Sequence, residues 1–239
     1  MDVAPGVAIA VRKTRIFYHV IRSTSALNEH WPLLRNTIVT LRQLEDRHTT
    51  PLDGPEVQEK IRTAKIVFPY GWRFRAPGLV KKHAEKIRNY FRPIEAHENS
   101  SRQMVDRLRR SADVVVGVHI RRGDYQRWKD GRFFFPASRY ADWMREMAAQ
   151  FPGRKISFFV CSDEPRNTGE FPGLSVGLGV GPPVADLYTL AKCDYILGPV
   201  STFSQWASFY GAKPLLHFYS DNERIELERF HISDLDLIE

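Results

Sequence analysis

One stretch in the middle of the chain constrains the fold more than any other: residues 114–125, which read VVVGVHIRRGDY. Five β-favouring apolar residues, interrupted by a single glycine, are typical of a strand buried in a parallel sheet. The run then changes abruptly to His119, two arginines and an aspartate. Open α/β sheets place their ligand sites in the loops at the carboxyl ends of such strands. The stretch therefore predicts an α/β fold with a site at Arg121 and Arg122, and an ordinary arginine-rich surface loop is the alternative.

The residues after this strand alternate in the same way. Apolar runs predict further strands at 156–161, 174–178, 194–198 and 213–218. Apolar residues at helical spacing predict helices that begin at Pro136, at Val184 and near Phe203, the last closed by Gly211. Strand and helix in alternation indicate a doubly wound parallel sheet.

The first half of the chain is less regular and more basic. Its patterns predict strands at 13–21 and 64–69 and helices at 28–47, 77–91 and 98–110. Residues 1–112 contain 21 Lys and Arg against 11 Asp and Glu, whereas residues 113–239 contain 14 against 17. Because the net charge and the regularity of the strand and helix pattern change at the same place, we expect a short amino-terminal domain at 1–112 and a nucleotide-binding domain at 113–239.

Composition narrows the class of protein. No segment reaches the roughly 18 apolar residues of a membrane span, and the amino terminus lacks the pattern of a signal peptide. Cys161 and Cys193 are the only cysteines, so no disulfide framework is expected and a cytoplasmic location is favoured. The basic half suggests an acidic partner, such as an anionic saccharide, a nucleotide or the inner face of a membrane. Nucleic acid is disfavoured, because no recognised binding motif accompanies the charge.

Three strand ends in the second half carry polar side chains, and a parallel sheet brings them to one edge. They are residues 119–124, 162–164 and 199–205. Two guanidinium groups at this edge suit a diphosphate, because each offers a planar fork of donors and keeps its charge near neutral pH. No glycine-rich phosphate loop of the Walker or dinucleotide type is present.

Three single residues each admit more than one role. Ser201 is a natural helix N-cap, and it either caps alone or marks a helix start that attracts phosphate oxygens. Asp186 either stabilises a helix dipole or accepts hydrogen bonds from a purine edge. His119 is a candidate base or a packed strand-end residue; a metal site is disfavoured because no His or Cys lies at ligand spacing.

Two motifs at these positions resemble those of fucosyltransferases. HIRRGD at 119–124 matches the His-x-Arg-Arg-x-Asp motif of the α-1,2-fucosyltransferases (glycosyltransferase family 11), which the α-1,6- and protein O-fucosyltransferases share. The run from DLY at 186–188 through CDYILG at 193–198 to STFSQWA at 201–207 resembles their second nucleotide-binding region. The resemblance implies a GT-B arrangement, in which two Rossmann-like domains face each other across a cleft and the carboxyl-terminal one binds GDP-fucose.

The resemblance also implies roles for individual residues. Arg122 would bind the β-phosphate, and Arg121 would support the loop or the phosphates. His119 and Asp186 would face the guanine and the ribose. The other expected substrate-binding residues, close to the diphosphate, are Asp163, Ser201, Thr202, Phe203 and Ser204.

The implied reaction is an inverting transfer of L-fucose from GDP-fucose to a hydroxyl of a glycan acceptor. Fixed cations and N–H donors would stabilise the departing diphosphate, so no metal or other cofactor is expected. Asp124 is the candidate general base, and its alternative role is to hold an arginine in place. A glycosyltransferase that uses another nucleotide sugar, or a non-catalytic nucleotide- or glycan-binding relative, remains the alternative function.

Overall fold

A computed structural model describes residues 38–42, 50–70, 74–179 and 181–235, and every structural statement below concerns these residues. The chain divides into two units, Met1–Lys82 and His83–Glu239. This division lies earlier in the chain than the boundary expected between Ala112 and Asp113. The helix before that expected boundary, α5 (Glu95–Arg109), buries Val105 and Leu108 and therefore packs with the second unit.

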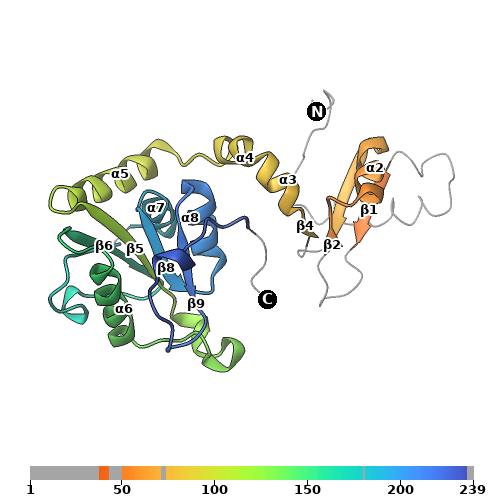
Figure 1. Cartoon of the computed structure of the whole chain (residues 1–239). Coiled ribbons are helices and arrows are strands. Elements are labelled where there is room, and N and C mark those ends of the chain that lie inside the picture. The colour runs from red at the N-terminus through yellow and green to blue at the C-terminus, as the bar shows by residue number, and fades with distance from the viewer. Residues whose placement is uncertain (1–37, 43–49, 71–73, 180, 236–239) are drawn as a thin grey trace. The chain divides into compact units, whose positions relative to one another are not determined.

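The second unit is built on one sheet whose five strands are all parallel (Figure 1). The strands, in the order in which they lie side by side, are β7 (Val176–Leu178), β6 (Ile156–Ser162), β5 (Val114–Ile120), β8 (Tyr195–Pro199) and β9 (Leu215–Phe218). Every residue of β5 is buried, as expected for the central strand of a sheet covered on both faces. The predicted parallel α/β sheet is therefore confirmed; the facing of two domains across a cleft stays a prediction.

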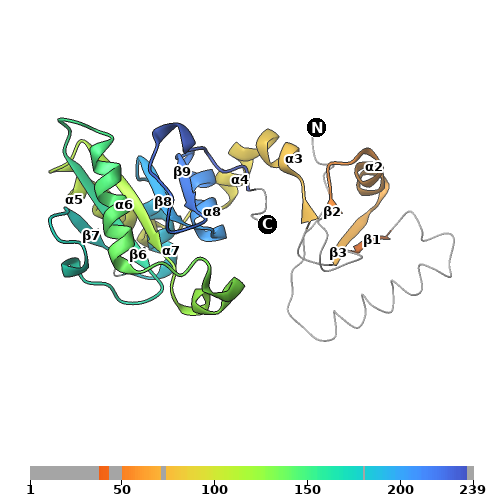
Figure 2. The ribbon, with the colours of Figure 1, turned by 60° about the horizontal axis from the view of Figure 1, so that its bottom comes forward.

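Helices cover both faces of this sheet (Figure 2). On one face, α6 (Ala137–Ala149) buries Trp143 and Met144 in the same core as Val116 and Val118 of β5. On the other face, α5, α7 (Pro183–Leu190) and α8 (Thr202–Gly211) enclose a second core around Phe159. An ion pair of 2.9 Å between Glu98 of α5 and Lys192, just after α7, joins these helices. The predicted helices of the second half are thus confirmed.

Helix α8 ends at Gly211, as expected. The residue after it, Ala212, takes the left-handed conformation, with φ of 50°. Gly211 is needed because a Cβ at this position would lie 1.9 Å from the backbone oxygen of Ala191. The missing side chain therefore lets α8 approach the end of α7.

Short single-turn helices fill the connections of the second unit. They are η2 (Gly123–Gln126), η3 (Trp128–Gly131), η4 (Thr168–Glu170) and η5 (Leu227–Arg229). The first two follow β5 directly, and they carry the chain from the arginine pair to α6.

The first unit contains two small parallel pairs of strands. β1 (Ile38–Arg42) pairs with β3 (Ile66–Tyr70), and β2 (Thr50–Pro51) pairs with β4 (Phe74–Arg75). Helix α2 (Pro55–Thr63) precedes β3. The strand predicted at 64–69 is confirmed as β3, and the strand predicted at 13–21 lies outside the described residues.

Two predicted helices of the first half need correction. Residues 38–42, expected within a helix at 28–47, form β1, because Ile-Val-Thr is a β-branched run that pairs well along β3. The helix predicted at 77–91 is interrupted at His83, which separates α3 (Pro77–Lys82) from α4 (Ala84–Tyr90). No described helix has the length and hydropathy needed to cross a membrane.

Candidate functional site

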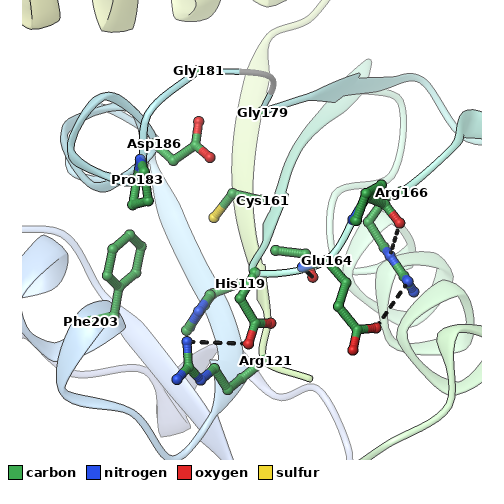
Figure 3. Close-up of a pocket in the computed structure, with 13 residues that line it drawn as sticks. His119, Arg121, Cys161, Glu164, Arg166, Gly179, Gly181, Pro183, Asp186 and Phe203 are labelled. Atoms are coloured by element: carbon green, nitrogen blue, oxygen red, sulfur yellow. Dashed lines mark hydrogen bonds and ion pairs between the residues drawn. The ribbon is translucent and has the colours of Figure 1, made fainter. Parts of the chain in front are cut away.

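The strand order creates a natural binding site at the carboxyl edge of the sheet. From β5 the chain moves outward to β6 and β7, then returns to the other side of β5 to form β8 and β9. In such sheets ligands bind beside the point where the order reverses. A pocket of about 460 Å³ lies there (Figure 3). Its lining consists of His119, Arg121, Cys161, Ser162, Asp163, Glu164, Pro165, Arg166, Gly179, Gly181, Pro183, Asp186 and Phe203.

His119, near the end of β5, presents a buried imidazole to this pocket. Its ring lies 4.9 Å from the ring of Phe203, at an interplanar angle of 34°, so the two side chains form one wall (Figure 3). Burial, with a smaller contribution from the charge of Arg121, lowers the pKa of His119 to about 3. The ring is therefore neutral near pH 7. Within the described part of the chain its Nδ1 has no hydrogen-bond partner, and such a buried polar atom is unfavourable unless a ligand or a water molecule satisfies it.

Asp186, in the first turn of α7, places a carboxylate at the opposite side of the pocket (Figure 3). Burial raises its pKa to about 6, so the group is mostly ionised at pH 7 and exchanges a proton just below it. Gly179 makes this position possible, because a Cβ there would lie 2.5 Å from the carboxylate. The arrangement leaves a hydrogen-bond acceptor facing the pocket.

Arg121 is the arginine of the pair that lines the pocket. Its guanidinium forms an ion pair of 2.7 Å with Asp124 and another of 3.3 Å with Asp163. It also lies 5.6 Å from the centre of the Tyr125 ring. Two carboxylates and one aromatic ring thus hold a positive charge at the pocket wall.

Arg122 lies outside the pocket lining and is fixed in the surrounding structure. Its Nη1 donates a 2.9 Å hydrogen bond to the carbonyl oxygen of Phe135, and its guanidinium carbon lies 3.6 Å from the centre of the Phe134 ring. Its Nε is 3.6 Å from a carboxylate oxygen of Glu164. Its backbone N–H donates to Asp163 at 2.7 Å. These contacts tie the loop after β5 to the loop after β6.

The two candidate carboxylates of this edge also differ in position. Asp163 lines the pocket and contacts both arginines. Asp124 lies outside the lining, is exposed, and pairs with Arg121. Its contact corresponds to the alternative role considered for it, that of holding an arginine.

The serine-rich start of α8 contributes only Phe203 to the pocket lining. The Ser201 hydroxyl accepts a 3.2 Å hydrogen bond from the backbone N–H of Phe203, which is an N-cap. Ser204 is fully buried, donates to the Ser201 carbonyl at 3.0 Å and lies 2.9 Å from Nε2 of His217. Thr202, the first residue of α8, is exposed.

Ser162 and Glu164 belong to the polar strand end at 162–164 that was expected at this edge, although no role was given to either residue. Pro165 and Arg166, which come next in the chain, were not among the expected residues. Gly179, Gly181 and Pro183 come from a turn-rich segment whose spacing matches no phosphate loop. Within the described ranges, no three His, Cys, Asp or Glu side chains gather in a way that could hold a metal ion.

Parts of this chain are similar to known proteins in sequence and in structure. Nodulation protein Z of Azorhizobium caulinodans is 31% identical over a stretch that covers 45% of this chain and 43% of that protein. A crystal structure of POFUT1 in complex with GDP-fucose superposes with a TM-score of 0.50 at 15% identity, and it covers 71% of this chain and 60% of that one. The structural likeness concerns the fold. This chain spans less than half the length of the curated relative.

A family model matches most of the described structure. It is that of glycosyl transferase family 11, and the match runs from residue 60 to residue 214. The matched range includes the whole pocket lining and both arginines of the HIRRGD motif. The chain therefore belongs to glycosyl transferase family 11.

Proposed function

We propose that this chain binds GDP-fucose and serves the transfer of L-fucose to a hydroxyl of a glycan. One observation carries the proposal: a single pocket at the carboxyl edge of the sheet combines a fixed guanidinium, an unsatisfied imidazole and a carboxylate. Family membership supports it, and so does the fold shared with POFUT1, which was crystallised with GDP-fucose.

The guanine would lie between His119, Asp186 and Phe203. Guanine carries N–H donors at N1 and N2, and the Asp186 carboxylate is an acceptor that suits them. Adenine presents an acceptor in place of the N1–H, so the same carboxylate would disfavour it. His119 Nδ1, without a protein partner in the described residues, gains one from the base or the ribose.

The diphosphate would lie against Arg121. As the bond between the fucose C1 and the phosphate oxygen breaks, its electrons leave with GDP and negative charge grows on the diphosphate. A guanidinium already held by Asp163 and Asp124 stabilises that charge without reorganising. In this proposal Arg121 takes the phosphate role expected of Arg122, and Arg122 fixes the loops. No divalent metal is required.

The acceptor hydroxyl would attack C1 from the face opposite the diphosphate, so the β-linked donor gives an α-linked product. The acceptor oxygen forms the new bond to C1, and its proton passes to a base or to solvent. Asp124 serves in this proposal to orient Arg121 rather than as that base. The proposed linkage is α-1,2, as the resemblance to the α-1,2-fucosyltransferases implies. Residues 1–112, the expected acceptor-side domain, are basic, and an anionic membrane surface is a second candidate partner for them.

Calorimetric titration with GDP, UDP and ADP tests the donor assignment. We expect GDP to bind at least tenfold more tightly than the other two, with the same affinity in excess EDTA. Tighter binding of UDP or ADP would refute GDP-fucose as the donor, and loss of affinity in EDTA would refute the metal-independent site. GDP binding without release of GDP from GDP-fucose, across a panel of glycans, would instead indicate a non-catalytic relative.

A further inference from the structure

A second surface lies beside the pocket, on the loop that follows Arg121. Residues 126–132 of this loop read QRWKDGR. Trp128 is 36% exposed, although it is the largest side chain of the loop and apolar. An exposed tryptophan at the carboxyl edge of a parallel sheet is a candidate contact for a ligand.

A row of aromatic rings connects Trp128 with the pocket. Arg121 lies over the Tyr125 ring, whose centre is 4.8 Å from that of Trp128. The Trp128 ring in turn lies 5.2 Å from that of Phe133, which is buried. Trp128 is thus supported from beneath by packed rings, and it stands two contacts away from the proposed phosphate-binding arginine.

The charges of this loop are not neutralised by neighbouring residues. Arg127, Lys129 and Arg132 are exposed, and none of them forms an ion pair with any described residue. Lys129 and Arg132 lie 5.4 Å from the centres of the Trp128 and Phe133 rings, respectively. Asp130 is the one carboxylate among residues 126–132.

Arginines on either side of the loop behave differently. Arg121 pairs with Asp124 and Asp163, Arg122 with Glu164, and Arg139 with Glu146. Between residues 121 and 139, the described cations without an ion pair are therefore Arg127, Lys129 and Arg132. Such a patch favours an anionic partner.

The backbone of the loop is unusual at the same place. Lys129, Asp130 and Gly131 have successive positive φ values of 48°, 58° and 75°. Residues other than glycine seldom adopt this conformation, and it concentrates at sites that contact ligands. The turn leaves Trp128, Lys129 and Asp130 exposed.

We propose that Trp128, with Arg127, Lys129 and Arg132, forms an acceptor subsite for an acidic saccharide. The proposal rests on the proposed transferase function, which requires a glycan acceptor near the donor pocket. The apolar C–H face of a sugar ring would pack on the indole, and a carboxylate or sulfate of the saccharide would pair with the free cations.

Binding of defined tetrasaccharides to the full chain tests this subsite. The acidic probes are tetragalacturonate and a hyaluronan tetrasaccharide, and the neutral probe is maltotetraose. We expect at least one acidic probe to bind about tenfold more tightly than maltotetraose, with an affinity that falls steeply as salt rises. If neither acidic probe binds more tightly than the neutral one, the proposal is wrong.

Substitutions then locate the surface. Trp128→Ala should lower the affinity for the acidic probe by about tenfold or more. Trp128→Phe should retain most of the wild-type affinity. Lys129→Gln and Arg132→Gln should each reduce affinity for the acidic probe and leave the neutral probe unaffected. Tyr90→Ala is the matched control, since Tyr90 is 83% exposed but lies on α4, away from the loop. Equal affinity of Trp128→Ala and wild type would overturn the assignment.

Titration with GDP on the same samples separates this inference from the proposed function. If the wild-type chain binds the acidic probe through Trp128 but does not bind GDP, the donor assignment fails and the saccharide surface stands. If it binds GDP and the acidic probe binds independently of Trp128, the subsite fails and the donor assignment stands.

Discussion

The two neighbouring arginines should separate ligand binding from stability when each is replaced by alanine. Arg121 lines the pocket, whereas Arg122 is held by Phe135, Phe134 and Glu164. We therefore expect Arg121→Ala to weaken the binding of GDP with little effect on stability. Arg122→Ala should lower stability and change GDP affinity less.

The size of the binding effect follows from the contact that is lost. A hydrogen bond from a charged donor to a phosphate contributes about 1.5–3 kcal/mol, so Arg121→Ala should raise the Kd of GDP by roughly 10- to 150-fold. Guanosine lacks the diphosphate and should bind both forms equally. Hydrolysis of GDP-fucose should slow by about 100-fold or more, because charge on the diphosphate grows in the transition state.

The size of the stability effect also differs between the two sites. The ion pairs of Arg121 with Asp124 and Asp163 are partly exposed, and such pairs contribute at most about 1 kcal/mol to the free energy of unfolding. Removal of the Arg122 side chain deletes a charged hydrogen bond and a close contact with the Phe134 ring. The two together contribute about 2–4 kcal/mol, which corresponds to a fall in Tm of roughly 5 °C or more.

Calorimetry with GDP and guanosine, together with thermal unfolding of both variants, checks the two expectations. The decisive quantity is the factor by which a substitution raises the Kd of GDP, divided by the factor by which it raises the Kd of guanosine. The reasoning is refuted if Arg122→Ala selectively loses GDP at unchanged Tm while Arg121→Ala binds GDP normally. It is also refuted if Arg121→Ala weakens guanosine as much as GDP.

Three further predictions concern the Asp186 carboxylate and the packing of α8. Because burial raises the pKa of Asp186 to about 6, the affinity for guanosine should increase from pH 5 to pH 7 and then level off. Asp186→Asn should abolish this pH dependence. Guanosine is the ligand of choice because the phosphate of GDP itself titrates near pH 6. The stability of the ligand-free chain should change with pH in the opposite direction. Between about pH 4 and pH 6 the folded state binds more protons than the unfolded state, so the free energy of unfolding should fall as pH rises through this range. Gly211→Ala should lower the free energy of unfolding, measured by chemical denaturation, by about 3 kcal/mol, because the new Cβ would lie 1.9 Å from the Ala191 oxygen. Gly181→Ala is the control: its nearest contact is at 3.6 Å, and it should lower the free energy of unfolding by less than about 1 kcal/mol.

The second unit could be predicted well from the sequence because its signals are local. A buried parallel strand needs a continuous apolar run, and β5, β6, β8 and β9 each have one. Charged or polar residues stop these runs at one edge, and that change of residue type predicts the edge at which the pocket lies. The first unit carries weaker signals: Ile38 and Leu41 fit a helical stripe, yet pairing with β3 determines the conformation of that segment.

Asp186 was a candidate from the sequence, but the role of the glycines beside it could not be predicted, because it depends on contacts that form only in the folded chain. Gly177, Gly179 and Gly181 match no known phosphate loop by spacing. In the structure Gly179 is required by the Asp186 carboxylate, which α7 brings back against it. The glycine therefore serves a side chain that follows it in the sequence, rather than a phosphate.

The choice between Arg121 and Arg122 was within reach of the sequence through the alternation of side chains in extended backbone. Successive residues of a strand point to opposite faces, so residues two apart share one face. His119 lines the pocket, and Arg121, two residues later, lines it as well, whereas Arg122 is directed to Phe134 and Phe135. A match to the motif does not distinguish the two arginines, whereas the alternation of side chains along an extended backbone does. If His119 contacts the nucleotide as proposed, the same geometry supports the proposal that Arg121 contacts its phosphates.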